Sequence, residues 1–433
     1  MQEGEIMKQF KLLISLMVLF FATNMFAQTW TAQTSNVTRD LASGWAVDTN
    51  IAWFCGGVNT GSNAVCIRTT NGGTTWTSVI GNIPQTIGLF TISAINATEA
   101  WTGASDGSVY HTTNAGVNWT FVQMPTPVTA FVDVIHFFTP QIGFIIGDPA
   151  TTTWCYYWTT NAGTNWTAAG PTFTGSEAGW NNGYGVIDTA HIWFGTNNTK
   201  IYKGSFRGGY TAYPSVGLYS FGMAFTNAST GVAIMANASG FLANNTTVNG
   251  GTSWAAGFTP AGQQYGLKSI PGYPYMWSAG ASGTTGIIYY STNNGTNWTS
   301  QFTTTAPLFS LTLANVNCGW AGGTAGAIFK YHGIINDINN NNSTVPVNYA
   351  LEQNYPNPFN PTTTINYSIP KASFVTLKVY SVLGNEVMSI VNEQQSAKNY
   401  TYNVDFSKLS SGVYYYTLRA GDFSSTKKLM LIK

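Results

Sequence analysis

Acidic side chains in the middle of the chain could supply a general acid and a base. Glycosidases need two carboxylates that face each other across a sugar. Sequence spacing brings no two of these acids together, and acids that cap turns or lie in solvent are equally typical. A carbohydrate-active hydrolase is therefore one hypothesis, with four candidate residues: Asp133, Asp148, Glu177 and Asp188.

Other chemistry has weaker support. The histidines His111, His136, His191 and His332 are scattered, and none lies in a metal-binding or nucleophile motif. No phosphate-binding loop or dinucleotide fingerprint occurs. We therefore expect no metal and no cofactor.

Two of the four cysteines, Cys55 and Cys66, flank a predicted hairpin loop. They could face each other and form a disulfide in an oxidising compartment. Two buried thiols are the equal alternative.

Aromatic residues gather in stretches that we expect to be long connections, 170–184, 206–221 and 260–277. Tyrosine and tryptophan in loops offer broad contact area at low entropic cost, which suits glycan or protein recognition. The alternative is that the rings pack the loops down. The candidate binding residues are Trp180, Tyr210, Tyr213, Tyr219, Tyr265, Tyr273, Tyr275 and Trp277.

The composition limits the possible partners. Formal net charge is +1, charged residues make up 8% of the chain and aromatic residues 15%. No charged face is large enough for nucleic acid or an anionic membrane. Abundant Trp, Tyr, Thr, Gly and Asn favour twisted sheets with tight turns.

These residues are positioned by a repeat. A phrase that reads Thr-Thr-Asn-Gly-Gly-Thr-Thr-Trp at residues 69–76 returns at residues 112–119, 159–166, 247–254 and 291–298. The interval is close to 44 residues, and a degenerate copy without Asn and Trp lies at residues 201–206. Each period contains four short runs typical of strands, such as 89–94, 100–103, 109–112 and 119–122, which is the pattern of a propeller blade.

The last unit, around residues 318–331, lacks a fourth strand, and Thr29-Trp30-Thr31-Ala32 matches the missing phrase. We predict that this N-terminal strand closes a seven-bladed β-propeller over residues 28–332, which removes the free sheet edges. We expect the protein to be a monomer.

The repeated phrase resembles the Asp-box of sialidase-like propellers and the repeats of photosystem II assembly factor-like propellers, with Asn in the Asp position. Each Asn can accept N–H bonds within its turn, each Gly can adopt a positive φ, and each Trp can cover the turn. The resemblance implies a structural role. The residues concerned are Asn71, Gly73, Trp76, Asn114, Gly116, Trp119, Asn161, Gly163, Trp166, Asn249, Gly251, Trp254, Asn293, Gly295 and Trp298.

Sialidase activity itself is disfavoured, because the chain departs from the pattern that the resemblance implies. The family's chemistry implies an arginine triad, and the middle region holds only Arg39, Arg68 and Arg207, with Arg68 inside a predicted strand.

The N-terminus has the pattern of a signal peptide over residues 1–27, with Lys8 and Lys11 before an apolar run from Leu12 to Ala22. A membrane anchor is the alternative, but the run is short for a bilayer span. We expect no membrane span after cleavage.

An Asn-rich linker is predicted over residues 333–348. The remaining residues, 349–433, differ in composition from the repeats before them. The phrases at residues 351–361, 379–384, 409–415 and 427–433 closely resemble type IX secretion sorting domains. The resemblance implies a small Ig-like antiparallel β-sandwich, recognition by the type IX translocon, and a secreted or surface location in a Gram-negative, Bacteroidetes-like bacterium. The leading hypothesis is an exported propeller that binds or scaffolds without catalysis; the hydrolase is the alternative.

Overall fold

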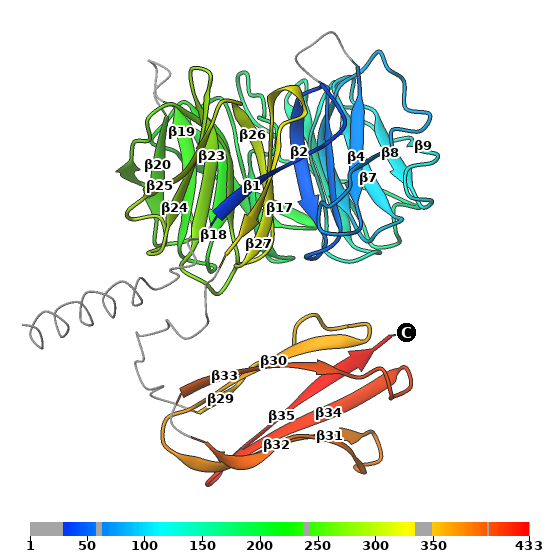
Figure 1. Ribbon diagram of the computed structural model, residues 1–433, viewed down its shortest axis with the longest axis vertical. Coiled ribbons are helices and arrows are strands. Elements are labelled where there is room, and N and C mark those ends of the chain that lie inside the picture. Colours follow the sequence, from blue (N-terminus) through cyan, green and yellow to red (C-terminus); the bar gives the residue numbers. More distant parts are fainter. Residues whose placement is uncertain (1–28, 58–62, 237–241, 334–348, 396–397, 433) are drawn as a thin grey trace, which may run out of the picture. The chain divides into compact units, whose positions relative to one another are not determined.

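The computed structural model describes residues 29–57, 63–236, 242–333, 349–395 and 398–432. The predicted signal peptide lies outside these residues, as does the predicted linker after Gly333. The chain divides into two compact units, residues 1–334 and 335–433 (Figure 1). Within the described residues, no helix is long and apolar enough to cross a membrane.

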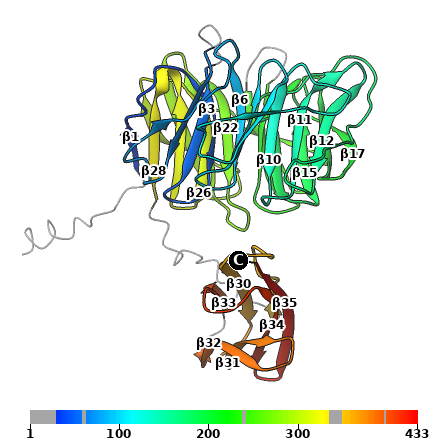
Figure 2. The same ribbon diagram turned by 90° about the vertical axis from the view of Figure 1, so that its right-hand side faces the viewer.

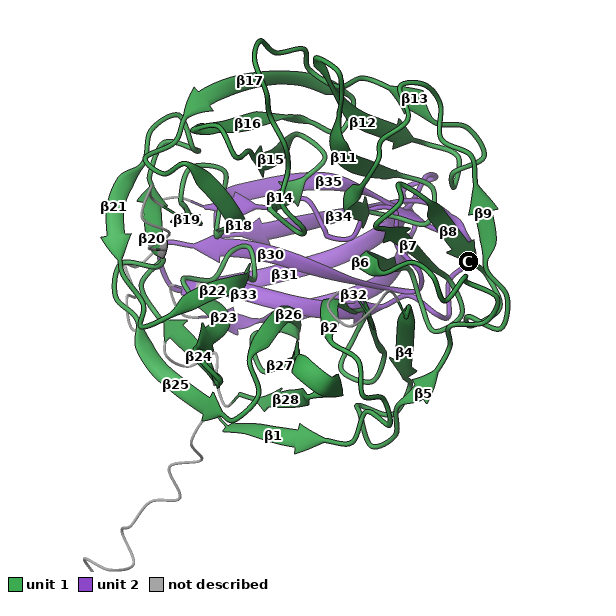
Figure 3. Cartoon of the chain, turned by 90° about the horizontal axis from the view of Figure 1, so that it is seen from above, with its two compact units in different colours: residues 1–334 green, residues 335–433 purple. Residues whose placement is uncertain are grey.

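The first unit is a ring of seven four-stranded antiparallel sheets (Figure 3). Each sheet is a blade; in six blades the strands run from the axis outward in chain order, and in the seventh β1 lies outside β28. The inner strands are β2 (Leu41–Ala46), β6 (Leu89–Ala94), β10 (Val132–Phe137), β14 (Tyr184–Asp188), β18 (Tyr219–Phe225), β22 (Gln263–Ser269) and β26 (Leu308–Asn315). The second strands are β3 (Ala52–Gly56), β7 (Ala100–Ala104), β11 (Gly143–Ala150), β15 (His191–Gly195), β19 (Gly231–Ala236), β23 (Met276–Ser282) and β27 (Cys318–Gly323).

The outer half of each blade completes the sheet. The third strands are β4 (Val65–Thr69), β8 (Val109–Thr112), β12 (Thr153–Thr159), β16 (Lys200–Ser205), β20 (Leu242–Thr247), β24 (Thr285–Ser291) and β28 (Ile328–His332). The outermost are β5 (Thr77–Ser78), β9 (Thr120–Val122), β13 (Thr167–Ala168), β17 (Gly208–Pro214), β21 (Ala255–Phe258), β25 (Thr299–Thr304) and β1 (Thr29–Gln33). Because strands alternate in direction, all inner strands begin at one face of the ring, the upper face. The Asn-containing turns lie at the other, the lower face.

The N-terminal strand closes the ring as predicted. β1 pairs antiparallel with β28, from Thr29 opposite His332 to Gln33 opposite Ile328 (Figure 2). The Gln33 side chain accepts from the indole N–H of Trp76 at 3.1 Å and of Trp320 at 3.2 Å. Blade 7 is thereby tied to the first Asn-containing turn.

Tryptophans stack the blades against one another. Five second strands carry a fully buried Trp at the same register position: Trp53, Trp101, Trp193, Trp277 and Trp320. Three of these rings meet the turn Trp of the next blade edge to face, in the pairs Trp53–Trp119, Trp101–Trp166 and Trp320–Trp76. The buried Trp of a second strand and the Trp of the Asn-containing turn therefore supply the two halves of one contact between blades.

The Asn-containing turns share one hydrogen-bond pattern. In the first, Asn71 Oδ1 accepts from the Thr75 backbone N–H at 2.9 Å and from the Thr69 hydroxyl at 3.0 Å. Gly73 has φ +84°, and a Cβ there would collide with the Gln33 side chain. The other four turns repeat the bond from the backbone N–H to the Asn oxygen at 2.9–3.0 Å.

Asn71→Ala should lower the free energy of unfolding by about 1–2 kcal/mol, because a backbone N–H and a hydroxyl lose their acceptor. Asn71→Asp keeps that oxygen and should recover most of the loss. Urea unfolding measures both. An Asp variant as unstable as the Ala variant would contradict this role of the side-chain oxygen.

The second unit is a β-sandwich. One sheet contains β29 (Ala350–Leu351), β30 (Thr362–Ile369) and β33 (Lys398–Asp405). The other has the order β32 (Glu386–Gln395), β31 (Ser373–Ser381), β34 (Gly412–Ala420) and β35 (Phe423–Leu431). Burial alternates along β30, as the sequence predicted.

The fold corrects the expected connections and agrees with one of the two alternatives for the cysteines. Stretch 206–221 is mostly strand, β17 and the start of β18, and stretch 260–277 contains β22 and the start of β23. Cys55 and Cys66 do lie directly opposite each other on β3 and β4, but both are buried free thiols. Burial raises the pKa of Cys55 to about 12, which makes this thiol unreactive.

Candidate functional site

A β-bulge interrupts six of the seven inner strands just after each begins, at the upper face. One residue there has no partner on the second strand, and such a residue is re-aimed out of the regular pleat. The bulged residues are Ala42, Phe90, Asp133, Phe221, Tyr265 and Phe309. Four of the six are aromatic.

Further aromatic rings join these four. The ring centroids of Trp180 and Phe221 are 4.4 Å apart, and those of Tyr265 and Phe309 are 5.5 Å apart. Phe90 and Phe131 lie at 4.3 Å, and Tyr219 lies 6.4 Å from Phe221. We call the set the aromatic collar: Phe90, Phe131, Trp180, Tyr219, Phe221, Tyr265 and Phe309.

The collar keeps exposed ring surface. Trp180 is 43% exposed and Tyr219 is 40% exposed, whereas Phe221, Tyr265 and Phe309 are half-buried. Partly exposed aromatic rings on a rigid scaffold are the usual anchors of a binding surface.

The segment that carries Trp180 is fixed at several points. The Asn182 amide donates to the Phe90 carbonyl at 3.2 Å and accepts from the Ser43 hydroxyl at 3.2 Å, so it reaches the inner strands of blades 1 and 2. Its backbone N–H donates to the Asp133 carbonyl at 3.0 Å. The segment therefore crosses the axis at the upper face and holds Trp180 in place.

Glu177 anchors the other end of this segment. Its carboxylate accepts from Trp154 Nε1 at 2.9 Å and from the Tyr202 hydroxyl at 3.0 Å, and it pairs with Lys200 Nζ at 2.6 Å. The side chain is fully buried. An acid with all these partners is structural, and the hydrolase hypothesis loses this candidate.

Asp133 and Asp148 are the candidate acids that come together. Gly179 N–H donates to Asp148 Oδ1 at 2.7 Å, and a Cβ at Gly179 would lie 2.5 Å from Asp133 Oδ2. Burial, and secondly the charge of Asp148, raise the pKa of Asp133 well above its usual range. Asp133 is 3% exposed beneath the segment, so the pair does not face an open sugar site.

Asp188 lies away from that pair, at the lower face. Its carboxylate accepts from the Ala190 N–H and contacts His191 Nδ1, both at 2.8 Å. This is the turn-capping role that the sequence left open.

The eight aromatic candidates from the sequence divide into two groups. Trp180, Tyr219 and Tyr265 belong to the collar, and the other five do not. Tyr273 and Tyr275 lie in the turn between β22 and β23 at the lower face, and Tyr213 is half-buried in the outer strand β17.

One of these five is corrected as a binding candidate. Trp277 is fully buried against Tyr290 and Tyr331, so it cannot contact a ligand. Tyr210 is half-buried on β17 and packs between Tyr156 and Phe194.

Sequence reasoning missed Phe90, Phe131, Phe221 and Phe309. A signal was present, since an aromatic residue precedes a small one near the start of four inner strands. These pairs are Phe90-Thr91, Phe221-Gly222, Tyr265-Gly266 and Phe309-Ser310.

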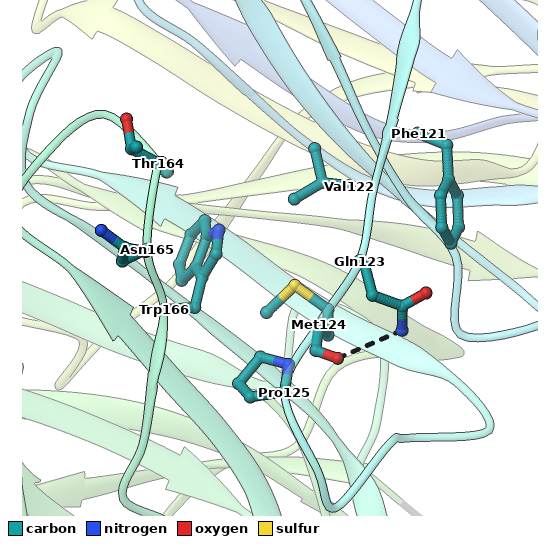
Figure 4. A pocket seen from close by; sticks show the side chains of 9 residues that line it. Phe121, Val122, Gln123, Met124, Pro125, Thr164, Asn165 and Trp166 are labelled. Atoms are coloured by element: carbon teal, nitrogen blue, oxygen red, sulfur yellow. Dashed lines mark hydrogen bonds between the residues drawn. The ribbon is translucent and has the colours of Figure 1, made fainter.

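Apart from the collar, a shallow hollow of about 490 Å³ lies on the outer rim between blades 2 and 3. It is lined by Phe121 and Met124 on one side and by the Trp166 turn on the other (Figure 4). Phe121 is 53% exposed. Polar Gln123, Thr164 and Asn165 also line this rim hollow, and Gln123 Nε2 donates to the Met124 carbonyl at 3.2 Å.

Two residues of the motif at 351–361, which begins the second unit, are buried in its β-sandwich. Asn354 is 2% exposed, and its amide donates to Thr363 Oγ1 at 2.9 Å and to the Pro356 carbonyl at 3.1 Å. Phe359, 3% exposed, packs edge to face on Phe406 at 4.9 Å.

Fold and motifs together define a propeller protein with a C-terminal domain for export. That domain is a secretion-system sorting domain: residues 353–433 match the family described as "Secretion system C-terminal sorting domain". The match assigns the chain to secretion. No curated protein matches the chain by sequence.

Solved structures support the propeller fold. The chain is similar to "YCF48 bound to D1 peptide", with 17% identity, a TM-score of 0.55, and coverage of 70% of this chain and 97% of that chain. It is also similar to "YCF48 from Cyanidioschyzon merolae", with 16% identity, TM-score 0.52, and coverage of 70% and 98%. A third similar structure is "Streptogramin B lyase structure", with 11% identity, a TM-score of 0.52, and coverage of 72% of this chain and 99% of that chain. At these identities the likeness shows the fold alone.

Proposed function

We propose that the chain is an exported binding module whose aromatic collar binds a neutral glycan at the bacterial surface. The observation that carries this proposal is the collar itself: partly exposed rings set by bulges in rigid inner strands, with Trp180 fixed by the segment across the axis. Such preorganisation lowers the entropic cost of binding.

The character of the surface supports a neutral ligand. Aromatic ring faces suit the apolar faces of sugars, and the amide of Gln263, whose oxygen accepts from the Tyr265 hydroxyl, can serve sugar hydroxyl groups. The acid nearest the collar, Asp133, is buried. Sorting by the C-terminal domain would place this surface outside the cell, where polysaccharides are available.

A protein segment is the second candidate ligand. Its support is that a propeller of the same fold, YCF48, is described as bound to a D1 peptide. The aromatic collar suits extended peptides as well as sugars.

Trp180→Ala and Phe221→Ala should each weaken binding about thirtyfold, which corresponds to about 2 kcal/mol for a buried aromatic anchor. Titration calorimetry against neutral polysaccharides and extracted surface proteins measures this. Phe121→Ala is the matched control, because it removes an exposed ring from the rim hollow. If Phe121→Ala weakens glycan binding and Trp180→Ala does not, the glycan binds at the rim hollow, and the collar proposal is wrong. Saturable binding of surface proteins alone would favour the second ligand class.

A further inference from the structure

Three inner strands bring unusual side chains to the axis near the lower face. Trp45, His136 and Lys268 occupy the same register position, opposite Trp53, Phe144 and Trp277 of their second strands. The rings of Trp45 and His136 are 5.1 Å apart although blade 2 separates their blades. These side chains therefore extend toward the axis from β2, β10 and β22.

Lys268 reaches the same place from blade 6. Its Nζ lies 5.4 Å from the ring centroid of Tyr184 in blade 4, and the Tyr184 hydroxyl is 3.2 Å from His136 Nδ1. Trp45, His136 and Lys268 are half-buried, so solvent reaches the cluster. We call Trp45, His136, Tyr184 and Lys268 the axial cluster.

No acid neutralises this cation. Among the described residues, none of the ion pairs involves Lys268. The corresponding inner-strand residues of the other blades, Ser93, Gly185, Ala224 and Thr312, cannot be ionised. A half-buried ammonium group with no ion-pair partner is partly desolvated, so this arrangement points to an anionic partner that the described residues do not provide.

The protonation states fit an anion acceptor. Burial lowers the pKa of Lys268 to about 8, so the amine is mostly cationic at pH 7. Burial, and then the charge of Lys268, lower the pKa of His136 to about 3. The neutral imidazole keeps one N–H, and burial raises the pKa of Tyr184, so its hydroxyl keeps its proton. The cluster offers donors and no carboxylate.

We propose that the axial cluster binds a small oxyanion, either an inorganic sulfate or phosphate or the carboxylate of an acidic sugar, with Lys268 as the charge partner. This site is separate from the aromatic collar, because it lies at the opposite end of the inner strands. It stands whether or not the collar binds a glycan.

The test is titration calorimetry on the full chain at pH 7, with sodium sulfate, sodium phosphate and sodium glucuronate at constant ionic strength set by chloride. We expect saturable binding, weakened at least about tenfold by Lys268→Met, because a charged hydrogen bond contributes that much. Lys268→Arg should retain affinity. The matched control is Lys203→Met, since Lys203 is also half-buried over an aromatic ring, that of Trp193 at 5.8 Å.

Stability provides a second readout. Lys268→Met should leave the ligand-free protein as stable or more stable, because it removes an unpaired cation. Raising the pH from 7 to 9.5 should weaken binding, since the amine loses its proton as the pH passes about 8. His136 and Tyr184 keep their protonation over this range. Comparing the affinities for sulfate and for glucuronate shows whether the site prefers an inorganic anion or a sugar carboxylate. The proposal is overturned if none of the three anions saturates, or if Lys268→Met binds as tightly as the unmodified chain.

Discussion

A chain that lacks residues 349–433 will remain inside the cell envelope, whereas the full chain reaches the surface or the medium. The expectation rests on the sorting-domain match over residues 353–433 and on the separation of the two units near residue 334. Because the propeller has its own core, the truncated protein should still fold. Immunoblots of medium, surface-exposed and periplasmic fractions from the native bacterium measure the change.

Paired substitutions show whether export requires the folded sandwich. Phe359→Asp places a charge in the core, where the ring is 3% exposed against Phe406. It should unfold the domain and retain the chain inside, because an unpaired buried charge is destabilising by several kcal/mol. Phe374→Asp makes the same change at a site that is 56% exposed and should be exported normally. Truncated protein that appears at the surface in full amount would refute the sorting role of this domain.

The fold could be predicted because the repeated Asn-containing phrase marks the turn of each blade and its Trp packs one blade on the next. Blade 4 lacks this Asn and Trp; it was predicted as a blade, but its stretch 206–221 was wrongly expected to be a connection. In blade 4 only Phe206 and Arg207 join β16 to β17, so the chain turns tightly and β17 runs for seven residues. Without an Asn-containing turn, Tyr210 and Tyr213 looked like loop residues.

The candidate site was predicted only in part, for a physical reason. A bulge depends on the register between two strands, and one strand's sequence does not show it. Phe221 closed an expected connection in the sequence, and Phe309 had no feature that marked it, until the register left both without a partner on the second strand. Trp180 was found because its Gly- and Asn-rich surroundings mark a true connection.

The acids show the same limit. Asp133 and Asp148 converge only because β10 and β11 pair and the segment around Gly179 folds over them. Their sequence spacing alone is compatible with an open active site. Burial, which sequence does not report, separates a closed acid pair from a catalytic one.

Ring closure makes Trp30 the substitution with the largest expected effect on stability. The ring is 6% exposed and lies 5.1 Å from Tyr331, and its N–H donates to Gln301 Oε1 at 2.8 Å. Trp30→Ala should lower the free energy of unfolding by about 3–5 kcal/mol, because it leaves a cavity and removes the hydrogen bond to Gln301. Since domains are stable by only about 5–15 kcal/mol, this is a large fraction of the total. Urea unfolding measures it.

The matched control is Thr31→Ala on the same strand, whose exposed hydroxyl is 3.0 Å from His332 Nε2. It should change stability by less than about 0.5 kcal/mol. Loss of β1 would also expose the edge of β28, and free edges pair with other chains. We therefore expect Trp30→Ala, and not Thr31→Ala, to aggregate before the ring unfolds completely. Equal stability of the two variants would mean that the ring is held closed by its blade interfaces, without help from the N-terminal strand.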